Sequence, residues 1–254
     1  CFTMGADAFD LAERLQTPVI VMSDLDIGMN EWVCDPLTWD DSRVHDRGKV
    51  LDAEALESFK AVKGKEWGRY LDVDGDGIPY RTLPGTHPTK GAYFTRGTSH
   101  NEMAGYTEDG HVNVQVMDRV LRKFQTAATL VPKPEITIRD ERSKTAIVYF
   151  GATTPAVTEA LDNLDRQGVK VNAIRLKAFP FGKEVVEFIA RHDRVFVVEQ
   201  NRDAQMRSLL MTEADVPGGK LIATLNYDGM PLTAAFVEGA VLKMLAPAKA
   251  AAAE

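Results

Sequence analysis

The chain has 254 residues, of which 44% are hydrophobic and 26% charged, the composition of an ordinary soluble globular protein with one large or two modest domains. Its formal charge of −7 argues against nucleic acid as the main partner, because phosphate binding needs a basic surface. No apolar run approaches the roughly 20 residues of a membrane span, and two cysteines, Cys1 and Cys34, indicate a reducing compartment rather than a disulfide framework. We therefore expect a cytoplasmic protein that binds neither nucleic acid nor membranes.

The N-terminal stretch predicts a helix followed by a buried strand. Apolar residues recur at helical spacing over residues 2–15, and residues 17–23 form an apolar, partly β-branched run after a turn at Pro18. One helix and one strand cannot bury both their faces, so we expect the rest of this domain upstream or in another chain. Because the helical pattern is already under way at Cys1, we expect a piece of a longer polypeptide.

The middle of the chain, from Glu31 to about Thr129, loses clear hydrophobic periodicity. Two helical pieces are predicted in it, near residues 53–62 and 114–126. A segment this irregular is uncommon unless it is functional or packs against other chains. The following residues, 130–140, hold two prolines and are predicted to be a linker.

The C-terminal part has the pattern of alternating strands and helices that predicts right-handed βαβ crossovers and a parallel sheet. Gly151 interrupts the first strand and is expected in a tight strand-to-helix turn, with Thr154 as helix N-cap and Pro155 at the first helical position. The predicted elements are strands at 145–150, 169–176, 195–199 and 221–225, a helix from Thr154 to about 168, helices at 183–191, 203–212 and 233–245, and an Ala-rich tail at 249–254.

A run of acidic residues and glycines, Asp72 to Gly77, matches the first half of an EF-hand loop, with carboxylates at positions 1, 3 and 5 and glycine at position 6. Position 12, which should be a bidentate Glu, is Leu83, and Pro79 disturbs the pairing of such loops. A hydrated turn is the simpler interpretation. A Ca²⁺-stabilised structural module stays open as an alternative, and we predict no metal site.

The same glycines, followed by Asn101, superficially match a thiamine-diphosphate and Mg²⁺ motif. That motif needs an apolar strand before it and a helix after it, and the prolines that follow forbid the helix.

Cationic and hydrogen-bonding residues concentrate in one polar stretch that includes His87, Arg96 and His100, and such groups hold carboxylates or phosphates. The alternative is a loop whose polar groups bind its own backbone. His45, His111 and His192 lie in polar settings typical of solvated side chains, and no three histidines share metal-site spacing. Glu199 and Asn201 end the third strand, at the edge where parallel sheets bind ligands or partners.

Three blocks of sequence resemble the α subunit of 2-oxoacid:ferredoxin oxidoreductases, and together they span nearly the whole chain. They are residues 9–28, residues 74–88 continuing through 90–98, and residues 151–154 with 197–201. The second block is most similar to the 2-oxoglutarate-specific branch.

The resemblance implies an α/β fold and a domain layout. Residues 1–31 are expected to be the C-terminal end of a pyrimidine-side thiamine-diphosphate domain, residues 32–130 its loop-rich extension, and residues 131–143 a linker. Residues 144–247 are expected to form a transketolase C-terminal-like parallel βαβ domain, followed by a tail at 248–254.

The resemblance also implies an activity, the oxidative decarboxylation of 2-oxoglutarate to succinyl-CoA with transfer of electrons to ferredoxin. Thiamine diphosphate and Mg²⁺ would be shared with a β subunit that also carries a [4Fe–4S] cluster, since two cysteines cannot supply four thiolates. Coenzyme A would be a substrate, and ferredoxin or an electron-accepting subunit a further partner, in a dimer of heterodimers. The family's Tyr-Pro-Ile-Thr-Pro and Gly-Pro-Ser-Thr-Gly stretches are absent and expected before Cys1, so no catalytic residue is assigned.

The role that remains possible for this chain is to line the entrance through which substrate or coenzyme A reaches the active site. The candidate residues for this role are Arg81, His87, Arg96 and His100. Glu199 and Asn201 are candidates for a subunit interface. The alternatives are an α subunit acting on pyruvate or another 2-oxoacid, and a non-catalytic scaffold or binding module with the same fold. The sequence leaves the oxoacid, the electron acceptor and the higher oligomeric state open.

Overall fold

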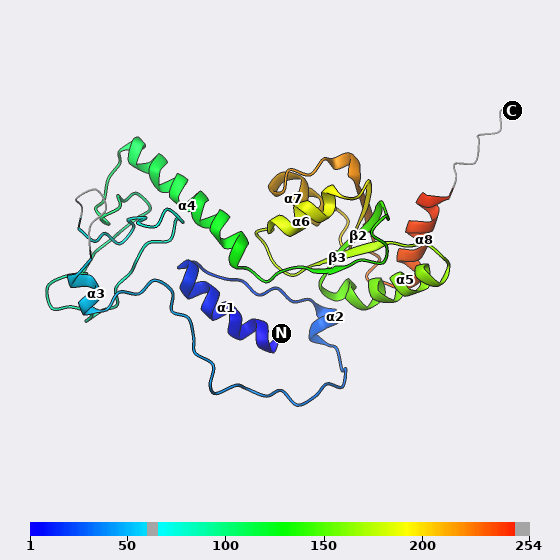
Figure 1. The fold of residues 1–254 in the computed structure, drawn as a ribbon, viewed down its shortest axis with the longest axis horizontal. Coiled ribbons are helices and arrows are strands. Elements are labelled where there is room, and N and C mark those ends of the chain that lie inside the picture. Colours follow the sequence, from blue (N-terminus) through cyan, green and yellow to red (C-terminus); the bar gives the residue numbers. More distant parts are fainter. Residues whose placement is uncertain (60–65, 247–254) are drawn as a thin grey trace. The chain divides into compact units, whose positions relative to one another are not determined.

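The computed structural model describes residues 1–59 and 66–246 and divides the chain into two compact units (Figure 1). The N-terminal unit comprises Cys1–Met22 and Cys34–Leu130, and the C-terminal unit comprises Ser23–Val33 and the chain from Val131 onward. The tail predicted at 249–254 lies outside the described residues.

The C-terminal unit is built on a sheet with strand order β1-β3-β2-β4-β5. The strands β2, β3, β4 and β5 are parallel, whereas β1 pairs antiparallel with β3. The α/β class and the parallel sheet predicted from the sequence are thus confirmed. The strands are β1 (Glu135–Thr137), β2 (Thr145–Phe150), β3 (Asn172–Leu176), β4 (Arg194–Glu199) and β5 (Leu221–Leu225).

Helices cover both faces of this sheet, which explains why its strands are apolar throughout. Along β2, Ile147 faces one core with α5 and α8, and Val148 faces the other with α6 and α7, because successive residues of a strand point to opposite faces. The helices are α5 (Thr154–Arg166), α6 (Lys183–Ala190), α7 (Gln205–Glu213) and α8 (Ala234–Leu245), with short 3₁₀ turns at Gly151–Thr153 (η2) and Gly218–Lys220 (η3).

Several details of this unit differ from the sequence-based prediction. The strand β3 begins at Asn172 rather than at residue 169, and α7 spans Gln205–Glu213 rather than residues 203–212. The N-cap of α5 is Thr153 rather than Thr154, because the η2 turn reaches the helix one residue earlier. The stretch predicted to be a linker contains β1, which pairs through Ile136 with Ile174. A three-residue edge strand with a largely exposed face carries too little apolar signal to be seen in the sequence.

The N-terminal unit consists of α1 (Phe2–Leu15), α3 (Ala53–Glu57), α4 (Gly110–Leu130) and long loops. Its small core joins Leu15 of α1, Ile78 of a loop and Ala127 of α4. The helix α1 has the predicted bounds and α4 is longer than predicted. The last part of the helix predicted at 53–62 lies outside the described residues. No helix in the described part of the chain is long and apolar enough to cross a bilayer.

The strand predicted at residues 17–23 is wrong. This stretch has no regular secondary structure, and Ile20 and Met22 are 78% and 82% exposed. A strand needs a neighbour to satisfy its backbone groups, and no described strand pairs with these residues. After them, Ser23–Val33 carries the short helix α2 (Leu25–Gly28) and belongs to the C-terminal unit.

Candidate functional site

The carboxyl edge of the parallel sheet is the position at which open α/β sheets bind ligands. The chain leaves β2 toward β3 on one side and later returns to β4 on the other side, so β2 and β4 flank a topological switch point. Ligands of such sheets bind in the crevice outside the strand ends at this point. Here Gly151 follows β2 directly, and Glu199 ends β4.

The segment that carries α2 lies at this edge and brings together two of the three sequence blocks that resemble the same family, residues 9–28 and residues 151–154 with 197–201. Asp24 caps α2 by accepting from the Ile27 amide at 2.9 Å, and a Cβ placed on Gly151 would lie 3.5 Å from Asp24 Oδ2. Gln200 Nε2 donates to Asp26 Oδ2 at 3.4 Å. The switch point is therefore occupied by a segment of the same unit. The φ of +58° at Gly151 is the reason that this position favours glycine, because a Cβ would make only an ordinary contact with Asp24.

Glu199 is fully buried and has an internal role that the sequence did not reveal. Its carboxylate accepts from the backbone amides of Met206 at 2.7 Å and Arg207 at 3.0 Å, and from Asn201 Nδ2 at 2.7 Å. The carboxylate thus satisfies free N–H groups at the positive end of α7. The interface role of Glu199 and Asn201 stays a prediction, and Asn201 is the more accessible of the two.

Two of the four entrance candidates are engaged in ion pairs of their own. Arg81 bonds the Glu13 carboxylate and donates to the Arg47 carbonyl at 3.0 Å. Hydrogen bonds from Arg47 and then Arg81 lower the pKa of Glu13. These contacts tie a loop to α1 and give Arg81 a structural role, and its role at the entrance stays a prediction.

His87 is held by Glu57 and by the turn that follows it. The His87 Nδ1 atom accepts from the amides of Thr89 at 3.1 Å and Lys90 at 2.9 Å, so the Nε2–H donates to Glu57 Oε1 at 2.8 Å. The Lys90 ammonium also bonds Glu57, and it lowers the pKa of this carboxyl more than His87 does. This arrangement matches the alternative of a loop that binds its own backbone.

Of the other two candidates, His100 lines a pocket of about 340 Å³ at the start of α4, and Arg96 is not among the lining residues. His100 also stacks on the Tyr70 ring with 3.8 Å between centroids. Arg96 lies 5.3 Å over the ring of Tyr106, whose hydroxyl donates to Glu108 at 2.5 Å and has a raised pKa because of that bond. The lining residues are Thr98, Ser99, His100, Thr107, Glu108, Asp109, Gly110, Asn113 and Val116.

This pocket joins hydroxyl and amide groups to two carboxylates at the N-terminus of a helix. The arrangement suits a polar ligand with both donors and acceptors rather than a bare anion. The sequence analysis singled out His100 and Arg96 but not the other polar residues near the pocket, Ser99, Thr107 and Asn113. A signal for this region was present in the sequence at Asp109. Its carboxylate accepts from the His111 amide at 2.8 Å and so marks the start of the helix that lines the pocket.

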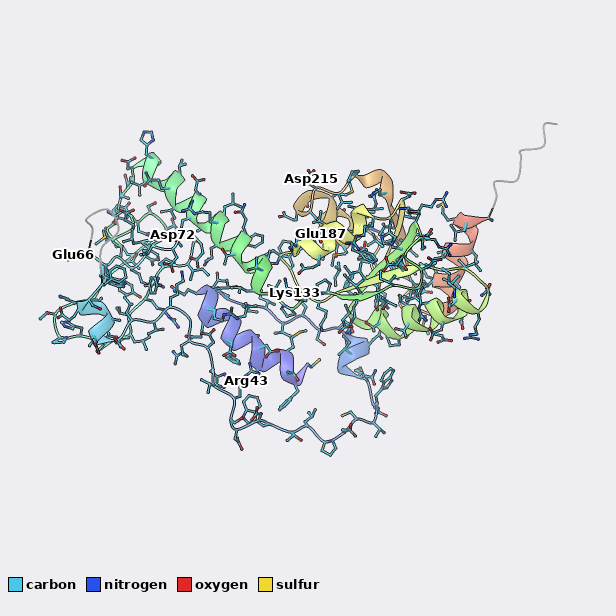
Figure 2. The ribbon with its side chains drawn as sticks, viewed as in Figure 1. Arg43, Glu66, Asp72, Lys133, Glu187 and Asp215 are labelled. Atoms are coloured by element: carbon cyan, nitrogen blue, oxygen red, sulfur yellow. The ribbon has the colours of Figure 1, made fainter. Side chains whose placement is uncertain are left out.

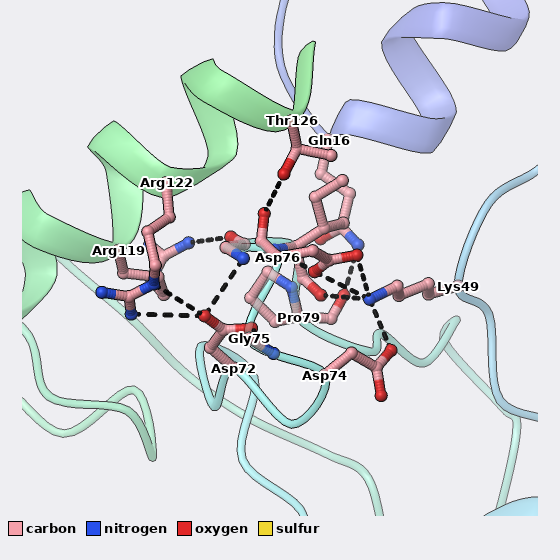
Figure 3. Close-up of polar contacts among 12 residues, drawn as sticks. Gln16, Lys49, Asp72, Asp74, Gly75, Asp76, Pro79, Arg119, Arg122 and Thr126 are labelled. Atoms are coloured by element: carbon pink, nitrogen blue, oxygen red, sulfur yellow. Dashed lines mark hydrogen bonds and ion pairs between the residues drawn. The ribbon is translucent and has the colours of Figure 1, made fainter. Parts of the chain in front are cut away.

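The acidic turn at Asp72–Gly77, whose Asp72 is labelled in Figure 2, is occupied by cations of the protein itself (Figure 3). Lys49 Nζ lies 2.6 Å from Asp74 Oδ2 and 2.8 Å from Asp76 Oδ2. Asp72 instead accepts from the amides of Gly75 and Gly77, both at 3.0 Å, and from Arg122. Asp74 and Asp76 thus share Lys49 while Asp72 has other partners, and the described residues hold no group of three metal-ligating side chains.

Burial of Lys49 alone would lower its pKa, but its hydrogen bonds to Asp74 and Asp76 outweigh burial and raise it. The same ammonium lowers the pKa of Asp74. The thiamine-type motif is not assembled either, because Asn101 uses its side chain to accept from the amides of Met103 at 3.0 Å and Gly105 at 2.9 Å.

His192, predicted to be solvated, is in fact buried, because it lies where α6 ends against β3. Its Nδ1–H donates to the Phe188 carbonyl at 2.7 Å and its Nε2 accepts from Asn172 Nδ2 at 3.0 Å. Burial lowers its pKa.

The described residues do not fit an iron–sulfur cluster or a thiamine pyrophosphate site. Cys1 and Cys34 are both free and exposed, and a [4Fe–4S] cluster needs four thiolates. No group of three His, Cys, Asp or Glu side chains in the described ranges is placed to hold a metal ion.

The fold and these sites define an α/β protein with a parallel sheet whose switch point is closed by its own α2.

No protein-family model matches the sequence. The chain is 30% identical over 243 residues to the 2-oxoacid:ferredoxin oxidoreductase 2 subunit alpha of Aeropyrum pernix, a match that covers 94% of this chain and 35% of the relative. It is 28% identical over 211 residues to the 2-oxoglutarate synthase subunit KorA of Methanothermobacter thermautotrophicus, covering 79% of this chain and 50% of that protein.

A solved structure has the same fold over nearly the whole chain. The 2-oxoglutarate:ferredoxin oxidoreductase from Magnetococcus marinus, solved with 2-oxoglutarate, coenzyme A and succinyl-CoA bound, matches with a TM-score of 0.78 and 22% identity over 96% of this chain and 40% of that one. The relatives of this chain are thus alpha subunits of 2-oxoacid:ferredoxin oxidoreductases, as its sequence blocks predict. The chain spans between about a third and a half of the length of these curated relatives.

Proposed function

We propose that the chain is part of the alpha subunit of a 2-oxoglutarate:ferredoxin oxidoreductase. The reaction converts 2-oxoglutarate and coenzyme A to succinyl-CoA and CO₂ and passes two electrons, one at a time, to ferredoxin. The observation that carries the proposal is the 30% identity to an alpha subunit over 94% of this chain, which includes both compact units.

The choice of 2-oxoglutarate has narrower support. It rests on residues 74–88, which resemble the 2-oxoglutarate-specific branch, and on the relative named 2-oxoglutarate synthase subunit KorA. A sibling enzyme acting on pyruvate or another 2-oxoacid is the rival within the family.

The proposal assigns the cofactors chiefly to a β subunit. Thiamine diphosphate with Mg²⁺ and the [4Fe–4S] cluster do not fit the side chains described here, so we place the cluster and the pyrophosphate site in that partner. The assembly would be a cytoplasmic dimer of heterodimers that delivers electrons to ferredoxin or to an electron-accepting subunit.

The role proposed for this chain is at the entrance for coenzyme A or the oxoacid. The pocket at the start of α4 supports it, because His100 lies in its wall and the Arg96 guanidinium lies over the ring of Tyr106, whose hydroxyl donates to Glu108 of that wall. Both substrates carry anionic groups, which a guanidinium binds well. Arg81 and His87, with ion-pair partners of their own, are the weaker candidates.

The proposed function can be tested in an activity assay under anaerobic conditions. The native complex that contains this chain is purified, and viologen reduction is followed with 2-oxoglutarate, with pyruvate or with neither, each with and without coenzyme A. Coenzyme A-dependent reduction with 2-oxoglutarate alone is the expected result. Reduction with pyruvate would keep the family and change the substrate, whereas no reduction by a complex loaded with cluster and thiamine diphosphate would favour a non-catalytic scaffold.

A further inference from the structure

The inward face of α4, within the N-terminal unit, carries two cations where an amphipathic helix normally places apolar residues. Val112, Val116 and Ala127 recur on this face at helical spacing and are partly or fully buried. Arg119 and Lys123 follow the same spacing and are partly buried as well. Lysine and arginine are seldom buried without a charged partner, so these two side chains are unusual for a helix that packs on loops.

Both cations contact only neutral acceptors in the part of the chain that the structure describes. Arg119 donates to the Gly77 carbonyl at 3.1 Å. Lys123 Nζ donates to the Gln16 carbonyl at 3.3 Å and to Thr17 Oγ1 at 3.2 Å. These bonds hold the two side chains in place but do not compensate their charges.

The carboxylate of Asp72 lies near this face but is bound to another cation. Arg122 takes it at 3.2 Å, as Figure 3 shows. Burial lowers the pKa of Arg119, and the longer-range attraction of Asp72 does not offset it. Burial and then the charges of Arg119 and Arg69 lower the pKa of Lys123. Two positive groups are thus kept partly out of water at a cost in free energy that a bound anion would relieve.

The ring of Tyr70 gathers these charges in one place. The guanidinium carbons of Arg69 and Arg119 lie 5.0 and 5.7 Å from its centroid, and His100 stacks on the same ring at 3.8 Å. Lys123 follows Arg119 by four residues, so the two side chains are neighbours on α4. We call Arg69, Tyr70, His100, Arg119 and Lys123 the Tyr70 cluster.

The charge of the Tyr70 cluster selects the kind of anion that fits it. Arg69 also bonds a neutral group, the Tyr93 hydroxyl at 3.4 Å. The positive charges of Arg69, Arg119 and Lys123 are therefore matched better by a dianion than by one carboxylate. A phosphate monoester carries about −1.5 to −2 charge at pH 7 and offers three acceptor oxygens to several donors at once.

We propose that the Tyr70 cluster is a binding site for a dianionic phosphate group, with Arg119 and Lys123 as its principal contacts. The inference goes beyond the proposed function and does not depend on it, because all the residues involved belong to the N-terminal unit. A carboxylate from another part of the subunit is the competing occupant, and the experiment distinguishes the two.

The experiment measures binding of inorganic phosphate to the full-length subunit that contains this chain, by titration calorimetry and by melting temperature. The native subunit is expected to bind phosphate saturably and to melt at a higher temperature with it. Arg119→Met/Lys123→Met should weaken this binding about tenfold or more, because charge-assisted hydrogen bonds are lost. Without phosphate the same variant should melt at a higher temperature than the native subunit, because uncompensated charges have left the inward face. Arg119→Lys keeps the charge and should retain part of the binding.

The matched control is Arg202→Met, which removes an exposed arginine of the C-terminal unit and should change neither quantity. Phosphate also stabilises folded proteins by exclusion from their surface, but this effect acts on every variant alike, so the difference between variants reports the site. A native subunit that binds no phosphate would overturn the proposal and favour a carboxylate as the occupant. A double variant that binds phosphate normally and melts at a lower temperature would overturn it in favour of a structural role for the two cations.

The source of the phosphate group is distinguished by competition with coenzyme A and with dephospho-coenzyme A, which lacks one phosphate. Displacement of phosphate by coenzyme A alone would assign the site to that substrate, and displacement by neither compound would assign it to free phosphate. Both results keep the site. A failure of the viologen assay would leave phosphate binding unchanged, so this proposal and the proposed function fail separately.

Discussion

Lys49 Nζ lies 2.9 and 2.8 Å from the two carboxylate oxygens of Asp76, so an ammonium group of the chain occupies the position that a metal ion would take in a loop of this sequence (Figure 3). Asp74 completes the pair of carboxylates at 2.6 Å. Two of the three aspartates are thus paired with a cation of the chain itself, and Asp72 is held by Arg122 and by the amides of the turn.

Removing this ammonium should make the stability of the N-terminal unit depend on divalent cations, and we expect no such dependence in the native chain. Lys49→Met is expected to destabilise the N-terminal unit by about 1–2 kcal/mol, between the values for exposed and buried ion pairs. The melting temperature of the variant should rise with millimolar Ca²⁺ and fall with a chelator. Lys133→Met, which breaks an exposed pair with Glu184, is the control. A Ca²⁺-dependent melting temperature in the native chain would instead restore the EF-hand interpretation.

Gly151 should be essential for folding rather than for chemistry. Its φ is +58°, a conformation that a β-branched residue rarely adopts, so Gly151→Val should cost about 2 kcal/mol. Gly239 of α8 has ordinary φ and open space around it, and Gly239→Ala should stabilise by about 0.5–1 kcal/mol. Thermal melting measures both. An unchanged melting temperature and complex mass for Gly151→Val would refute the role of this turn.

The buried carboxylate of Glu199 should matter through the start of α7. Glu199→Ala leaves the amides of Met206 and Arg207 without an acceptor in a buried place, which should cost about 2–4 kcal/mol. Glu199→Gln keeps one acceptor oxygen and should recover part of this loss. Chemical denaturation compares the two. Equal stability of both variants and the native chain would show that the amides find other partners.

His192 should make stability depend on pH. Its pKa is lowered from 6.5 by burial, so the unfolded chain takes up a proton at a higher pH than the folded chain. Stability is therefore full above about pH 6.5 and declines as the pH falls below that value, by at most about 1.4 kcal/mol per pH unit from this group. His192→Gln, which can still donate and accept, should flatten this part of the profile. His111→Gln, at the exposed start of α4, should not.

Arg96 provides the sharpest test of the entrance assigned to this chain. If the proposed function holds, Arg96→Ala should raise KM for coenzyme A or the oxoacid by about 5- to 20-fold, because a charge-assisted contact is lost, while kcat changes little. Arg142→Ala, an exposed arginine of the C-terminal unit, is the control. Unchanged kinetics for both substrates would remove this loop from the list of ligand contacts.

The elements that the sequence predicted well are those with a strong local signal. The bounds of α1 and β5 are those predicted, since α1 is amphipathic over its full length and β5 is a compact apolar run between breakers. Residues 17–23 have the same apolar signal as a strand, yet they form none, because a strand also needs a partner and composition does not report one.

The sequence by itself determined the α/β class, the parallel sheet and the family of the relatives, because hydrophobic periodicity and long runs of similar residues are properties of the chain. Only the tertiary structure decided which polar groups meet. Lys49 reaches Asp76 across 27 residues and Asp26 reaches Gln200 across 174, and the burial of His192 follows from the same packing. Such contacts are set by how distant segments pack on one another, and no local pattern of residue types encodes the partner of a charge.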